Sequence, residues 1–264
     1  APSGDGIVTS AASGKSGGVV QVSGSSTRAT SSPTVGITVG AGAELSARDV
    51  AIDATSIGNA SSMSANSGGG LVSVGSADSS VTVNTTAGAT FGNRASVTAT
   101  HDISILSTTT QNAEVLSQTG SGGLAGFGDA DVRGTLTYTS GIQIGDDVVM
   151  SAENELNAES RSSLKANAGA EADAAGLGAD ASTSARLDVT GATATQVGED
   201  ARLEAGTVRL KAIVTGMQAR SKAESDATAA IADSDASAQV NVTETTDVVL
   251  AGGTESQISP FFFV

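Results

Sequence analysis

The chain has 264 residues, a formal net charge of −15 at pH 7, no cysteine and no tryptophan. Hydrophobic residues make up 39 % of it but aromatic residues only 2 %, which excludes a core filled by large rings and favours a thin interior between two close backbone layers. The charge argues against nucleic acid and anionic membrane surfaces as partners, since both are bound through clustered Lys and Arg. No apolar run is long enough for membrane insertion, and the absence of cysteine does not fix the compartment.

A nine-residue motif recurs along the chain, with the pattern apolar–Gly–x–x–small–x–apolar–x–Ala. Its copies span residues 39–47, 91–99, 144–152 and 197–205, and a partial copy begins at Ala251. The motif glycines are separated by 52, 53, 53 and 54 residues, a regularity typical of units that stack. The partial copy contains Gly252. The repeat-defining glycines are Gly40, Gly92, Gly145 and Gly198 of this motif, together with Gly18, Gly70, Gly123 and Gly176 of a second marker.

A second marker, a small residue followed by an apolar one, lies 22 residues before each motif glycine. Its five copies are Gly18-Val19, Gly70-Leu71, Gly123-Leu124, Gly176-Leu177 and Ala230-Ile231. The two markers together predict a single repeat array over residues 1–259. The array comprises a partial copy at 1–38, copies at 39–90, 91–143, 144–196 and 197–250, and the start of another at 251–259. An apolar tail, residues 260–264 with Phe261–Phe263, lies outside the pattern.

Within each copy, apolar residues alternate with polar ones. Val50 and Ile52, Val81 and Val83, and the alanines of 166–174 all follow a period of two, which indicates β-strands. Residues 151–175 and 220–239 are rich in Ala and Glu and favour helix by propensity. Equivalent positions in other copies, 56–62 and 108–112, are poor helix formers, so we expect strands throughout.

The fold class expected from these patterns is all-β: an elongated parallel β-helix, or β-solenoid, of about four repeats of roughly 53 residues. Stacking lets each copy cover the strand edges and apolar face of the next. With about 20–30 residues per coil, each repeat would form about two coils, and about ten coils would give a rod on the order of 50 Å long. The alternative is a row of small β-sandwich units with antiparallel strands.

The repeat also resembles that of giant bacterial haemagglutinin-like adhesins. The resemblance rests on Ala-x-x-Gly-Gly-Leu-Val-x-Val-Gly-x-Ala, then Val-x-Val, then the nine-residue motif and Asp-Val-x-Ile-x-Ala. It is best in residues 65–99 and extends over 10–255, while the last copy departs from it with Ala230 in place of Gly. The resemblance implies an exported, parallel β-helical protein at a cell surface, acting in adhesion or as a structural fibre.

Few residues are candidates for chemistry. His101 is the one histidine, and we expect it to be a solvated surface residue, with no catalytic residues elsewhere in the chain. No cofactor is expected, with calcium as the one candidate ion. Its candidate ligands are Asp146, Asp147, Glu199 and Asp200, which match no established calcium loop and fall at the turn of the repeat, so their simpler interpretation is as turn residues.

The sequence therefore predicts a secreted structural or adhesive segment at a bacterial cell surface, a stiff rod and not an enzyme. Its partners would be neighbouring repeats, or identical subunits joined end to end, together with an unidentified host-cell or surface ligand. The first alternative is a self-assembling extracellular filament or sheath subunit. A less favoured one is a β-helical polysaccharide-active enzyme, which would need a local departure from the repeat to build a cleft.

Overall fold

The computed structural model describes residues 7–253 and 255–258, and within them the chain is all-β, without helix, and its strands pair in parallel. The tail at 260–264 lies outside the described residues. No helix long and apolar enough to cross a membrane occurs in the described ranges. The strands are β1 (Ile7–Ser31), β2 (Thr34–Val39), β3 (Glu44–Ala47), β4 (Val50–Phe91), β5 (Ser96–Ala99), β6 (Asp102–Ile144), β7 (Val149–Ala152), β8 (Glu155–Ala175), β9 (Gly178–Val197), β10 (Arg202–Ala205), β11 (Thr207–Thr228), β12 (Ile231–Leu250) and β13 (Glu255–Ile258).

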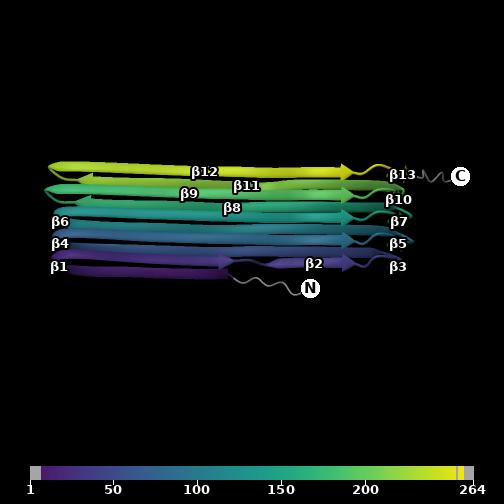
Figure 1. Ribbon diagram of the computed structural model, residues 1–264, viewed down its shortest axis with the longest axis horizontal. Helices are drawn as coiled ribbons and strands as arrows, with labels where there is room; N and C mark the ends of the chain where they lie inside the picture. The colour runs from purple at the N-terminus through teal and green to yellow at the C-terminus, as the bar shows by residue number, and fades with distance from the viewer. Residues whose placement is uncertain (1–6, 254, 259–264) are drawn as a thin grey trace.

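The chain runs through five similar coils. Each coil has an outward arm, a bend, a return arm and a short closing strand, as Figure 1 shows with the bends at the left and the closing strands at the right. In coils 2 and 3 a single long strand, β4 or β6, contains both arms and the bend. The coils occupy residues 7–47, 50–99, 102–152, 155–205 and 207–258.

Successive coils pair at equivalent repeat positions. Val50 pairs with Ile103, and Ile103 pairs with Leu156, so one repeat later in the sequence is one strand further along the stack. The same register holds on the return arms and in the closing strands. This parallel arrangement is consistent with the predicted β-solenoid and differs from a row of antiparallel sandwiches.

The prediction of two coils per repeat is wrong, because each repeat makes a single coil. Arms of about 20 residues extend about 65 Å, whereas five layers at about 4.8 Å give a stack of only about 20–25 Å. The longest dimension of the described chain therefore runs along the strands, not along the stack, as Figure 1 shows. The predicted 50 Å rod is corrected to a broad, short blade.

The Ala-rich segments are strands, as the period of two predicts. Alternate residues of β8, from Ala166 to Ala174, are buried, and the residues between them are exposed or half-buried. β8 pairs with β6 on one side and β11 on the other, so its backbone groups are satisfied by neighbouring coils and not within a helix. Parallel pairing thus overrides the helical propensity of Ala and Glu.

The interior between the arms is thin and partly polar. Ser107 and Ser140, on opposite arms of β6, lie with their hydroxyl oxygens 3.0 Å apart. Further along, Ser62 donates to Thr27 at 2.8 Å, and Ser79 donates to Ser62 at 2.9 Å. Larger apolar side chains fill the region nearer the closing strands, where Phe91 is buried. Small side chains therefore let the two layers approach, as the composition predicts.

The bend glycines are explained by contact between coils. A Cβ atom on Gly70 would lie 2.1 Å from the carbonyl oxygen of Gly18, and one on Gly123 would lie 1.9 Å from that of Gly70. At Gly176 the corresponding distance to Gly123 is 2.7 Å. At Gly18, in the first coil, the nearest atom would be 3.6 Å away. Glycine therefore fits the close contact at the bends of coils 2, 3 and 4, whereas coil 5 has alanine at the equivalent bend.

Candidate functional surfaces

The turn between the return arm and the closing strand is built by stacked backbone bonds. The N–H groups of Gly92, Gly145 and Gly198 donate to Val39, Phe91 and Ile144 of the preceding coil at 2.8–2.9 Å. The structure therefore places Gly40, Gly92, Gly145 and Gly198 above one another along the stack. The prediction is wrong for Gly252, because the N–H of Ala251 donates to Val197 O at 2.9 Å and so Ala251 lies over Gly198. Two residues after each glycine the backbone is left-handed, with φ of 62° at Arg94 and 56° at Asp147.

The predicted calcium ligands lie in this turn and serve its backbone. Asp146 accepts a hydrogen bond from the N–H of Glu199 at 2.9 Å through Oδ1, just as Asn93 accepts one from Asp146 at 3.2 Å. Asp147 and Asp200 occupy the left-handed position, with φ of 56° and 54°. Among the described residues these four are not brought together as a three-ligand cation group. The turn geometry supports their interpretation as turn residues.

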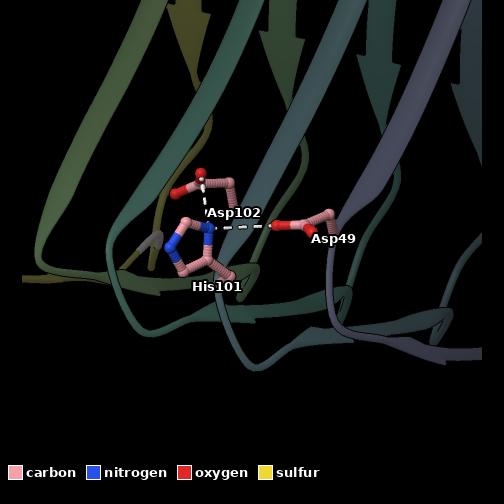
Figure 2. Close-up of side chains that lie close together, drawn as sticks. All are labelled: Asp49, His101 and Asp102. Carbon is pink, nitrogen blue, oxygen red and sulfur yellow. Dashed lines mark hydrogen bonds and ion pairs between the residues drawn. The ribbon is translucent and has the colours of Figure 1, made fainter.

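A different cluster forms at the next corner, where the closing strand leads into the following outward arm. His101 Nδ1 lies 3.0 Å from Asp49 Oδ1 and 2.9 Å from Asp102 Oδ2 (Figure 2). The three side chains are 44–55 % exposed. His101 is accessible to solvent, as predicted, but it is also fixed between two carboxylates, which the sequence did not predict.

An aliphatic ridge follows the bends of coils 1 to 4 at one register position, and Ile231 of coil 5, which pairs with Gly178, extends it one position further along the strand. Its side chains are the apolar members of the second marker, and they point outward. The exposed fractions are 68 % for Val19, 50 % for Leu71, 52 % for Leu124, 63 % for Leu177 and 80 % for Ile231. The second sequence marker places an apolar residue at each bend. The alternation of side chains along a strand does not predict whether a residue at a bend is exposed or buried. Contiguous exposed apolar side chains of this kind are typical of interaction surfaces.

The outer face of the return arms is acidic near the bend. Asp78, Asp129, Asp131 and Asp180 are exposed there on neighbouring coils. Partial burial raises the pKa of Asp129, and the nearby charges of Asp131, Asp78 and Asp180 raise it further. Partial burial and the charge of Asp131 likewise raise the pKa of Asp78. Such a face disfavours anionic ligands.

The terminal coils each pair on one side only within the described residues. β1 pairs with β4 alone among the strands, and β12 pairs with β9 alone. Side chains along β12 are almost all exposed, whereas those of the equivalent strand β9 alternate between buried and exposed. Among the described strands, β1 and β12 therefore each have one edge that pairs with no other described strand.

Comparisons of the chain with known proteins found no relative. No protein-family model matches the chain, and neither a curated protein nor a solved structure shows detectable similarity to it.

Proposed function

We propose that this chain is a structural and adhesive segment of an exported protein at a bacterial cell surface. The observation that carries the proposal is the long parallel register of its coils: β4 and β6 pair from Val50–Ile103 to Phe91–Ile144 except at the bend, and a register shift interrupts the pairing of β11 with β8 between Thr215 and Gln218. The resemblance to haemagglutinin-like adhesins supports the same function. In this proposal the stack is the load-bearing body, and further coils extend it into a stiff blade.

The mechanical argument follows from the direction of the hydrogen bonds. Backbone bonds between coils run along the stack, so a pull on the two ends of the stack loads a long row of them at once. The closing strands add a second ladder, and the bend glycines allow close contact at the far edge. A coil can leave only when both arms separate from their neighbour, which favours resistance to extension.

The adhesive surface that we propose is the aliphatic ridge. It runs across every described coil at the edge furthest from the closing strands, so a long stack would present many equal apolar contacts to a surface. Multiple weak contacts at fixed spacing raise the overall strength of attachment without a deep pocket. The ligand class that fits is an apolar or amphipathic surface, since the neighbouring acidic face disfavours polyanions.

Force spectroscopy on the full chain tests the load-bearing role. The chain has no cysteine, so Ser16→Cys and Ser237→Cys, at exposed positions of the first and last coils, provide specific handles. We expect stepwise extension in which each released coil of about 53 residues adds about 190 Å of contour length. Smooth extension at the low force of an unstructured chain contradicts the proposal.

Surface retention tests the adhesive role separately. Beads coated with the triple variant Leu71→Ser, Leu124→Ser, Leu177→Ser are expected to lose most of their retention on apolar and cell surfaces. The matched variant with Met at the same three positions keeps the ridge apolar and should retain binding. Equal retention of the two variants would exclude the ridge as the adhesive surface while leaving the load-bearing role intact.

A self-assembling filament is the second candidate, favoured by the unpaired edges of β1 and β12. Val20, Val72, Ala125, Gly178 and Ile231 pair in succession from the first coil to the last. If a second copy continued this register, its Val20 would pair with Ile231 of the first copy. Electron microscopy of the purified chain over a range of concentrations separates the candidates. Fibres with an axial repeat of about 24 Å, five coils long, support the filament, whereas soluble monomers support the segment.

A further inference from the structure

The corner cluster of Asp49, His101 and Asp102 has the dimensions of a metal site. Three possible ligand atoms, one imidazole nitrogen and two carboxylate oxygens, lie within 4.8 Å of one another. Both oxygens lie 2.9–3.0 Å from Nδ1. Two ligand atoms around a tetrahedral metal, with bonds of about 2.1 Å, are about 3.4 Å apart, so each oxygen would move by about 0.4 Å to hold an ion beside Nδ1. Figure 2 shows both carboxylates directed at the same nitrogen.

The register of the coils creates this group. Val50 pairs with Ile103, so Asp49 lies opposite Asp102 on the neighbouring coil, and His101 precedes Asp102 in the same turn. The turn is tied to the coils on both sides. The Thr100 N–H donates to Ala47 O at 3.2 Å, and the Asn154 N–H donates to His101 O at 3.0 Å. The side chains are therefore presented from anchored backbone.

Each carboxylate has a second oxygen that faces another group, through a hydrogen bond at Asp102 and a longer charge contact at Asp49. Asp102 Oδ1 accepts the N–H of Glu155 at 3.2 Å, which leaves Oδ2 to face His101. Asp49 Oδ2 lies 3.8 Å from Arg48 Nε, while its Oδ1 faces the imidazole. Outer contacts that orient metal ligands in this way are typical of protein metal sites.

We propose that Asp49, His101 and Asp102 bind one divalent transition-metal ion of the Zn²⁺ class. An imidazole nitrogen favours Zn²⁺, Co²⁺, Ni²⁺ or Cu²⁺, whereas Ca²⁺ and Mg²⁺ prefer oxygen ligands alone. The side chains are about half exposed, so water completes the coordination. The ion joins the turn between coils 1 and 2, which holds Asp49, to the turn between coils 2 and 3 with the start of β6, which hold His101 and Asp102, and it stabilises their contact by mass action. This site is independent of the adhesive role.

Titration of the untagged full chain with Zn²⁺, followed by calorimetry, tests the site. We expect saturable binding of one ion per chain, at least tenfold tighter than Ca²⁺ binding, and a rise in melting temperature. His101 is the only histidine, so its imidazole resonances report the binding without overlap. Co²⁺ offers a visible absorption spectrum as a second readout.

Three variants decide the assignment. His101→Asn removes the imidazole and introduces the residue found at the equivalent position of the next coil, which is Asn154. Asp49→Asn removes one of the two carboxylates. Both should weaken Zn²⁺ binding at least tenfold while leaving the circular dichroism spectrum unchanged. Asp146→Asn, the control, copies Asn93 and should bind Zn²⁺ as the unmodified chain does. Zn²⁺ binding that survives His101→Asn, or Zn²⁺ and Ca²⁺ binding equally, overturns the proposal and leaves only the polar contacts of His101 with the two carboxylates.

Discussion

Replacement of Gly70 by Ala should be among the most damaging single substitutions in the chain. The new Cβ would lie 2.1 Å from the carbonyl oxygen of Gly18 and 3.2 Å from its carbonyl carbon, where ordinary contacts begin at 3.4 Å. Both neighbours are backbone, so one coil must move by more than 1 Å relative to the other or lose its pairing at the bend. Overpacking of this kind costs on the order of 3 kcal/mol or more in the free energy of unfolding.

The matched control is Gly18→Ala, the same marker position in the first coil. Its Cβ would meet nothing closer than 3.6 Å, so we expect a change in the free energy of unfolding within about 0.5 kcal/mol. Urea denaturation followed by circular dichroism measures both variants, and hydrogen exchange locates the disturbance at the bends of coils 1 and 2. If Gly70→Ala is as stable as Gly18→Ala, the stacking of bends inferred from these contacts is wrong.

Three further substitutions use one coil as the template for another. Gln111 is fully buried, and its side-chain amide donates to Val83 O, Thr85 Oγ1 and Thr137 O. In urea denaturation, Gln111→Ala should therefore lower the free energy of unfolding by about 2–4 kcal/mol. Gln111→Leu places there the residue found at the paired position of the next coil, Leu164, and should lower it by less than about 1.5 kcal/mol. Arg94→Gly should raise the melting temperature, because glycine removes a left-handed backbone cost of about 1 kcal/mol. Asp129→Ser, copying Ser182, should stabilise by less than about 1 kcal/mol at pH 7. Because the pKa of Asp129 is raised in the folded state, the ionised carboxylate destabilises the fold at neutral pH, and this destabilisation is lost as the pH falls through that pKa. The difference in melting temperature between Asp129→Ser and the unmodified chain should therefore vanish below about pH 3.9 when thermal unfolding is measured at a series of pH values.

The strand period and the repeat length could be predicted because each is written directly in the residues. Alternation in 166–174 identified a strand against its helical propensity, and the marker glycines revealed the register between copies. The number of coils per repeat could not be predicted in the same way. It depends on how long an arm can run before it turns, and a thin interior of Ser, Thr and Ala imposes no break along an arm of about 20 residues.

The corner cluster was beyond prediction for a different reason. Asp49 and His101 are 52 residues apart, and only a register of one coil per repeat brings them together. With two coils per repeat, Asp49 and Asp102 would not lie on adjacent strands. The ridge was missed because a residue at a bend belongs to neither face of a strand, so the period of two does not decide its exposure.

Parallel, in-register stacking also explains why the copies differ at charged positions. Any ionised residue kept at one repeat position would meet its own copy about 4.8 Å away on the next coil. Along one column of the return arms the chain instead alternates, as Ser76, Asp129, Ser182 and Asp235. Where aspartates do stack, as Asp78 does on Asp131, partial burial raises the pKa of Asp78 and the charge of Asp131 raises it further. Divergence between copies therefore reduces this repulsion but does not remove it, since Glu171 still pairs with Glu224 and Asp180 with Asp233.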